Sequence, residues 1–127
     1  MHRISIKGLR FYGKYNEDHF KAIFKIAKVL DKDEISGIRG VYGTDGRVVT
    51  KANEQYSAGY YIRFTPLERS AHIILNLKYK DKTEENIDIY KSPIITIEGA
   101  LCKTEYDFAF TLLHEIGHHI TYDETDS

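Results

Sequence analysis

The sequence changes its hydrophobic period twice, and this change limits the folds that the chain can adopt. Residues 16–30 and 104–121 repeat apolar side chains at the helical spacing of three and four, whereas residues 35–98 form short alternating runs separated by turn residues. A backing helix, a meandering sheet and a C-terminal helix are therefore expected in this order. Elements segregated along the chain in this way are typical of an α+β protein.

The N-terminal part of the chain is expected to form a strand and then the backing helix. Residues 3–7, Arg-Ile-Ser-Ile-Lys, alternate apolar and polar side chains and suit a half-buried strand. Asn16 is the expected helix N-cap, and Glu17 and Asp18 place negative charge at the positive end of the helix dipole. The expected core face of this helix consists of Phe20, Ile23, Phe24, Ala27 and Leu30.

The middle of the chain is expected to form a mixed or antiparallel sheet of four to six strands. Strand patterns are clearest at residues 60–64, 73–79, 87–90 and 94–97. A hairpin is also predicted, in which residues 41–42 and 47–49 flank the turn Gly43-Thr44-Asp45-Gly46. Pro93 favours an edge strand or a strand start at the last of these segments, since proline donates no backbone hydrogen bond.

The last predicted element is a helix over residues 104–121. Its first residues, Thr104-Glu105-Tyr106-Asp107, have the form of a capping box. We expect this helix to face the core through one stripe, formed by Tyr106, Phe110, Leu113, Gly117 and Ile120. The missing side chain of Gly117 would then allow close packing against the sheet or another helix.

Length and charge narrow the classes of partner. A chain of 127 residues suits one domain, which we take to span residues 1–127. A net charge of -1 gives no electrostatic basis for binding nucleic acid or an anionic membrane.

Neither a signal peptide nor a membrane-spanning run is visible, so the location is left open with the cytoplasm as the default. Cys102 is the only cysteine, which excludes an internal disulfide, and we expect it to be buried and inert.

The segment Leu113-His114-Glu115-Ile116-Gly117-His118-His119 carries the most specific chemical pattern. His114 and His118 are four residues apart, so on a helix both can bind one cation at about 2.0 to 2.1 Å. Glu115 projects beside that face, where its carboxylate can take a proton from a metal-activated water. His119 lies about 140° around the helix from His114 and is expected to flank the site or to support its ligands from outside, without binding the metal. A polar helix end that binds no metal is the alternative interpretation.

His114-Glu115-Ile116-Gly117-His118 resembles the HExxH motif of the zincin metallopeptidases, whose backing helix, mixed sheet and active-site helix follow the order expected here. A weaker similarity to the anthrax-lethal-factor-like branch of the gluzincins lies in residues 59–62 and in the two leucines before His114. The resemblance implies bound zinc and hydrolysis of peptide bonds. It also implies that a peptide or protein substrate binds along an edge strand, with residues 94–97 or 73–77 as candidates.

The resemblance leaves the third metal ligand open. Gluzincins take it from a glutamate on a helix well after the motif. Only nine residues follow His118 in this sequence, so the C-terminal subdomain is expected to be minimal or absent here. Metzincin-like proteins place it six residues after the second histidine, which corresponds to Glu124, but Thr121 stands where they have a turn glycine. If the helix ends after Ile120, carboxylates of the tail reach the metal, namely Asp123, Glu124 or Asp126. Water, a second copy of the chain, His2 or His72 are further alternatives, although His72 suits a polar strand end better.

The sequence as a whole predicts a small zinc-dependent metallopeptidase. His114 and His118 are its expected metal ligands, Glu115 its general base, and Tyr122 a candidate for stabilising the oxyanion, although packing is the commoner role of a tyrosine. The rival interpretation is a metal-binding or inactive zincin-like module, such as a toxin, phage or regulatory domain, that lacks the third ligand. A purely structural interaction domain with an accidental motif is the third. The pattern makes no prediction of oligomeric state.

Overall fold

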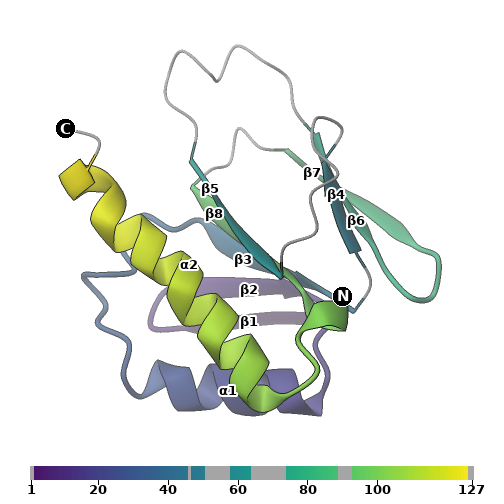
Figure 1. The fold of residues 1–127 in the computed structure, drawn as a ribbon, viewed down its shortest axis with the longest axis horizontal. Coiled ribbons are helices and arrows are strands. Elements are labelled where there is room, and N and C mark those ends of the chain that lie inside the picture. Colours follow the sequence, from purple (N-terminus) through teal and green to yellow (C-terminus); the bar gives the residue numbers. More distant parts are fainter. Residues whose placement is uncertain (1, 46, 51–57, 64–73, 89–92, 126–127) are drawn as a thin grey trace.

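The protein is described here by a computed structural model, in which two helices and two sheets are placed (Figure 1). The backbone is described for residues 2–45, 47–50, 58–63, 74–88 and 93–125. Side chains are described for residues 3–45, 58–63, 77–83, 85–86 and 93–121. Within these residues the structure is α+β, as expected from the sequence.

The larger sheet has five strands in the order β1-β2-β3-β8-β5 and is mixed. Its members are β1 (His2–Ile6), β2 (Leu9–Gly13), β3 (Gly40–Thr44), β8 (Ile94–Glu98) and β5 (Gly59–Ile62). The β1/β2 and β8/β5 pairs are antiparallel, whereas β2/β3 and β3/β8 are parallel. The expected first strand is therefore confirmed, and it continues into a hairpin through Lys7 and Gly8, whose φ values of 52° and 83° suit a type I′ turn.

Strand β8 lies in the middle of this sheet, and all five of its residues are buried. Pro93 directly precedes it, so the strand start is the correct one of the two positions expected for this proline. The prediction that residues 94–97 form a substrate-binding edge is wrong, because β3 and β5 pair with both edges of β8. A strand buried in this way is mostly apolar, which explains its three isoleucines, although Thr96 and Glu98 are buried in it as well.

The smaller sheet is antiparallel, with the order β4-β6-β7. Its strands are β4 (Arg47–Thr50), β6 (Ile74–Lys78) and β7 (Glu84–Asp88). Here too the central strand, β6, had been expected to be a substrate-binding edge, and that expectation is wrong. The predicted hairpin across residues 43–46 is also wrong, because β3 pairs with β2 and β8 and leaves no edge for β4. The chain instead crosses to the second sheet, and the Thr44 hydroxyl donates a hydrogen bond of 2.9 Å to the carbonyl of Lys78.

Helix α1 (Glu17–Ala27) begins as predicted, with the Asn16 side chain accepting a hydrogen bond of 2.9 Å from the His19 N–H. Its core face is shifted from the expected one. Ile23 is buried as expected, but Phe24 is 55% exposed, whereas His19, Ala22 and Ile26 are buried. Apolar residues of α1 fit more than one face of the helix, and the buried face includes a histidine that an apolar pattern does not count.

Helix α2 (Glu105–Thr125) follows a short 3-10 helix, η3 (Gly99–Leu101), and is capped by the Thr104 hydroxyl, which accepts from the Asp107 N–H at 3.0 Å. It packs against α1, β5 and β8 on one face of the larger sheet (Figure 1). The two helices and this face of the sheet enclose the main core, which includes Phe11, Val41, Ile95, Ile23, Ile26, Phe108 and Leu112.

The predicted core stripe of α2 is wrong for three of its five residues, whereas Ile120 is partly buried and packs against the core as expected. Tyr106, Phe110 and Leu113 are 74%, 60% and 44% exposed. The buried face consists of Phe108, Leu112, Glu115, Ile116 and His119. This helix carries apolar side chains on two faces, so its periodicity could not determine which face meets the sheet.

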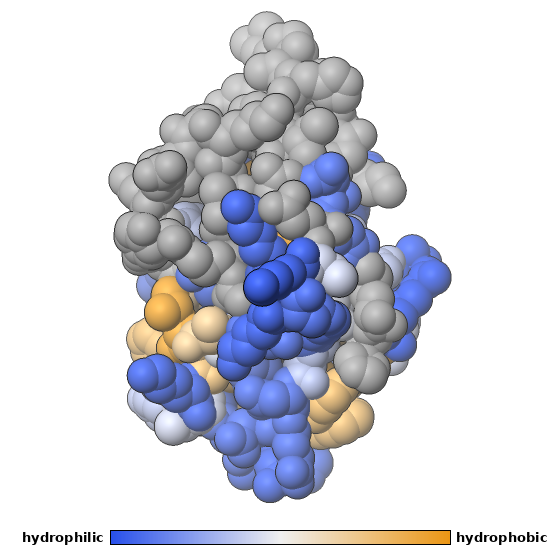
Figure 2. All heavy atoms as spheres, turned by 90° about the vertical axis from the view of Figure 1, so that its right-hand side faces the viewer, coloured by the Kyte–Doolittle hydropathy of each residue, from blue (hydrophilic) through white to orange (hydrophobic). Residues whose placement is uncertain are grey.

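The side of the molecule shown in Figure 2 is mostly hydrophilic where its residues are described, and apolar colour is confined to small areas. Among the described residues, no helix combines the length and the apolarity that a bilayer span requires.

Candidate metal centre

One turn of α2 brings together His114, Glu115 and His118. One ligand atom from each of these residues lies within 4.8 Å of the other two. The two histidine Nε2 atoms are 3.1 Å apart, and His118 Nε2 is 3.9 Å from Glu115 Oε1. This grouping is the one that the sequence predicted, and the spacing of four residues along a helix produces it.

The two imidazoles fit a zinc ion. Two nitrogen ligands at about 2.0–2.1 Å with a tetrahedral angle lie about 3.3 Å apart, close to the 3.1 Å between these Nε2 atoms. The 3.9 Å between His118 Nε2 and Glu115 Oε1 exceeds this spacing. Glu115 thus lies beside the two imidazoles but farther from His118 than a second zinc ligand would be in a tetrahedral site.

The Glu115 side chain differs from the histidines in its burial. It is 6% exposed, whereas the His118 side chain is 55% exposed. Loss of hydration raises the pKa of the Glu115 carboxyl, and the nearby His118 and His114 oppose that rise. Its Oε2 atom is buried and has no hydrogen-bond partner within the described part of the chain. A carboxyl with a raised pKa beside two imidazoles is a combination that often marks a functional site.

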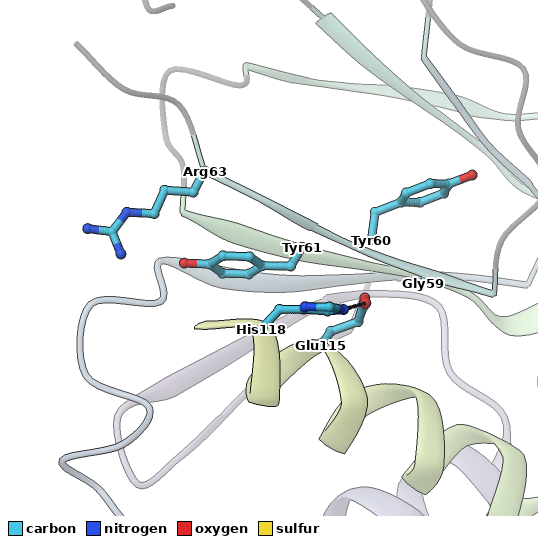
Figure 3. Close-up of a pocket in the computed structure, with 6 residues that line it drawn as sticks. All are labelled: Gly59, Tyr60, Tyr61, Arg63, Glu115 and His118. Carbon is cyan, nitrogen blue, oxygen red and sulfur yellow. Dashed lines mark ion pairs between the residues drawn. The ribbon is translucent and has the colours of Figure 1, made fainter. Parts of the chain in front are cut away.

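A pocket of about 350 Å³ opens between α2 and strand β5 (Figure 3). It is lined by Gly59, Tyr60, Tyr61, Arg63, Glu115 and His118. The side chains of Tyr60 and Tyr61 point to opposite sides of β5. Tyr61 points toward α2 and lies beside His118, which projects from that helix together with Glu115 (Figure 3). Strand β5 thus forms one wall of the pocket, and α2 supplies its chemical groups.

Gly59 allows β5 to lie directly against the helix. A Cβ atom at this position would come within 2.7 Å of Thr111 Cγ2 and 3.2 Å of Glu115 Cγ. By contrast, a Cβ at Gly117 would meet nothing within 4 Å. The expectation that Gly117 permits close packing is therefore not supported among the described residues, and Gly59 is the glycine that brings two elements together at the site.

His119 contacts two other parts of the molecule and neither of the two paired histidines, as the helical spacing predicted. It is buried, and its Nδ1 lies 2.6 Å from the Tyr61 hydroxyl oxygen. Its Nε2 lies 2.8 Å from the carbonyl oxygen of Ser36, in the loop between α1 and β3. His119 therefore connects the helix both to the pocket wall and to a distant loop.

The candidates for a third ligand or an oxyanion group stay predictions. The side chains of Tyr122, Asp123 and Glu124 lie outside the described residues, as do Asp126 and His72 and the side chain of His2. The backbone of α2 continues through Thr125, so the helix end after Ile120 that would bring the tail carboxylates to the metal is not present.

Cys102 is buried, as expected, and its Sγ lies 3.7 Å from the Thr111 hydroxyl. Burial raises the pKa of its thiol, which keeps it protonated and unreactive.

His19, on α1, supports the start of α2, and the sequence pattern did not single it out. Its Nδ1 accepts a hydrogen bond of 3.2 Å from the Asn16 N–H, and its Nε2 lies 3.1 Å from the Cys102 carbonyl oxygen. Its ring stacks on Phe108 with centroids 4.6 Å apart. His19 thereby links the start of α1 to the segment that leads into α2.

Comparison with known proteins identifies no relative of this chain. No protein-family model matches it, and neither a curated protein nor a solved structure matches it. The functional interpretation therefore rests on the residues of the site.

Proposed function

We propose that the protein is a zinc-dependent metallopeptidase, with His114 and His118 as metal ligands and Glu115 as the general base. One observation carries the proposal: two imidazoles at the spacing of zinc ligands share one helical turn with a buried carboxyl that lines a pocket. The α+β arrangement of a backing helix, a mixed sheet and a C-terminal site helix is compatible with a zincin-like fold, which we include in the proposal.

In this proposal the two histidines bind the metal and Glu115 transfers the proton. His114 and His118 hold zinc through their Nε2 atoms, which requires both rings to be deprotonated there. When bound, zinc supplies a Lewis acid that polarises a peptide carbonyl and makes a coordinated water more acidic. Glu115 removes a proton from the attacking water and delivers it to the leaving amine, and the raised pKa of its carboxyl suits both steps.

Strand β5 is the wall along which an extended substrate fits best. It is the last strand in the order β1-β2-β3-β8-β5, and its outer edge is the one that is turned away from β8. A peptide paired with that edge by backbone hydrogen bonds would run past the pocket that contains Glu115 and His118. The substrate edge is thus proposed for residues 59–62 in place of the two segments favoured by the sequence.

Zinc content and peptide cleavage test the proposal together. The chain, purified without chelators, is expected to carry one zinc per molecule and to cut at least one member of a peptide library analysed by mass spectrometry. Glu115→Gln should retain zinc and lose cleavage by at least about a hundredfold, because it removes the base and leaves both imidazoles. Glu105→Gln is the matched control, since Glu105 lies on the same helix, pairs with Lys25 and is remote from the pocket.

Three results would count against the proposal. Absence of zinc from the purified chain removes the metal centre. Zinc bound without any cleavage favours the alternative of a metal-binding or inactive module. Cleavage that persists in Glu115→Gln points to a contaminating protease or to another base.

A further inference from the structure

Two hydrogen bonds join strand β5, helix α2 and the loop before β3 at a single side chain. His119 Nε2 lies 2.8 Å from the Ser36 carbonyl oxygen, and His119 Nδ1 lies 2.6 Å from the Tyr61 hydroxyl. The Tyr61 and His119 rings meet edge to face, with centroids 5.4 Å apart. The three groups come from segments that are distant in sequence and converge beside His118.

The Ser36 carbonyl oxygen determines which atoms donate in these two hydrogen bonds. A carbonyl oxygen only accepts hydrogen bonds, so the proton of the neutral His119 ring must be on Nε2. Nδ1 is then an acceptor, and the Tyr61 hydroxyl donates its single proton to it. That proton is consequently committed to His119 and is not directed at a substrate oxygen.

The direction of these bonds determines what Tyr61 contributes to the site. A hydroxyl that donates to His119 cannot at the same time donate to a developing oxyanion, because a phenol has one proton. Its contribution is mechanical: it attaches the strand that forms the pocket wall to the helix that carries the metal-binding pair. Gly59, two residues earlier on the same strand, contacts the helix beside Glu115, so this part of β5 is fixed at two points.

We propose that Tyr61 is a positioning residue. Its hydrogen bond to His119 keeps strand β5 at the distance from His118 and Glu115 that an extended substrate needs. The role rests on the proposed peptidase function in so far as it concerns substrate. It assigns His119, the residue after the second metal ligand, to substrate alignment instead of metal binding.

The test compares Tyr61→Phe with wild type by steady-state kinetics, zinc binding and amide hydrogen exchange. The substrate is a peptide that wild type cleaves in the Glu115-dependent assay. Loss of one hydrogen bond predicts an increase in KM of about fivefold, with kcat changed less than about twofold and zinc affinity unchanged. The backbone amides of residues 59–62 should exchange faster than in wild type. Tyr42→Phe, on strand β3, which β8 separates from β5, is the control that should leave all of these values unchanged.

Two substitutions of His119 test the direction of the hydrogen bonds. In His119→Asn the side-chain oxygen can replace Nδ1 as the acceptor for Tyr61, whereas in His119→Gln the amide can replace the Nε2 donor to Ser36 but leaves Tyr61 without its acceptor. The Asn variant should therefore keep a KM close to wild type, and the Gln variant should resemble Tyr61→Phe. Nitrogen-15 spectra of the wild-type imidazole should show the proton of His119 on Nε2.

Several results would overturn the proposal. A fall in kcat of more than tenfold in Tyr61→Phe with unchanged KM would mean that Tyr61 acts on the reacting groups. Unchanged exchange of residues 59–62, or an Nδ1 proton on His119, would remove its structural basis. The exchange and nitrogen-15 measurements need no activity, so they test the Tyr61–His119 bond even if wild type cleaves no peptide, a result that would count against the peptidase function alone.

Discussion

The Nε2 atoms of His114 and His118 lie 3.1 Å apart although both side chains are exposed to solvent. The helix backbone produces this approach, and Phe110 supports it by stacking on the His114 ring at 6.0 Å between centroids. A metal bound by both rings would need both Nε2 atoms to be unprotonated, and the short distance between these atoms suits shared coordination of one cation.

Removing one imidazole should abolish tight zinc binding. We expect His118→Ala to lower zinc affinity by more than about a hundredfold, since even loss of a supporting residue near a metal costs 10- to 100-fold. In thermal unfolding, zinc at about 100 times the wild-type Kd should stabilise wild type by about 2.7 kcal/mol and the variant by less than about 0.4 kcal/mol. Titration calorimetry and melting curves measure both effects. Phe24→Ala, at an exposed position of α1, should bind zinc as wild type does, and an equal loss there would contradict a specific site.

Neutralising Glu115 should stabilise the metal-free protein. Burial raises the pKa of this carboxyl above its usual 4.5, so the folded state disfavours its charged form. Stability is therefore lost as pH rises from 4.5 through the raised pKa, and Glu115→Gln removes that loss. The variant should exceed wild type in free energy of unfolding by about 1 kcal/mol at pH 8, with a smaller difference at pH 4. Equal denaturant midpoints at pH 8 would show that burial imposes no cost on Glu115.

The local signals in the sequence predicted local structure well. Asn16 and Thr104 cap the two helices as their side chains indicated, and the spacing of His114 and His118 determines their geometry. Strand pairing was not predictable in the same way, because it depends on contacts between distant segments. The predicted hairpin over residues 43–46 does not form, because β3 pairs in parallel with β8, a strand some 50 residues later in the chain. Local turn propensity carries no information about such partners.

The wall of the site was missed for a related reason. Tyr61 and Arg63 line the pocket only because β5 pairs with β8 and lies over α2. The alternating pattern of this strand predicts that one of its faces is buried, but it does not identify the helix that packs against that face. Gly59 offered the only local signal, since an isolated glycine at the start of a strand often marks a close approach of backbone to another element.

His19 should make stability depend on pH below neutrality. Its Nδ1 accepts from the Asn16 N–H, so a proton added there breaks a bond of the helix cap. Burial lowers the pKa of His19 below its usual 6.5. The stabilisation is therefore complete above pH 6.5 and is lost as pH falls through the lowered pKa, because the unfolded chain then binds the proton more tightly. Denaturant unfolding of wild type between pH 7.5 and 5 measures this loss.

A variant isolates the contribution of this histidine from those of other groups. His19→Gln keeps a donor for the Cys102 carbonyl but has no group that titrates in this range. We expect it to be less stable than wild type at pH 7.5 by about 1 kcal/mol, since the cap loses a hydrogen bond. The difference should shrink as pH falls to 5. A difference that stays constant with pH would contradict the role given to the neutral His19 ring.

A pair of glycine substitutions distinguishes the packed side of α2 from its exposed side. At Gly59 a methyl group would lie 2.7 Å from Thr111 Cγ2, so Gly59→Ala should cost about 1–3 kcal/mol in free energy of unfolding. Thr111→Ser deletes that Cγ2 atom, and the double variant should recover part of the loss. At Gly117 a methyl group meets nothing within 4 Å, so Gly117→Ala should stabilise the helix by about 0.5–1 kcal/mol. Destabilisation by Gly117→Ala would mean that this side of α2 is covered in solution.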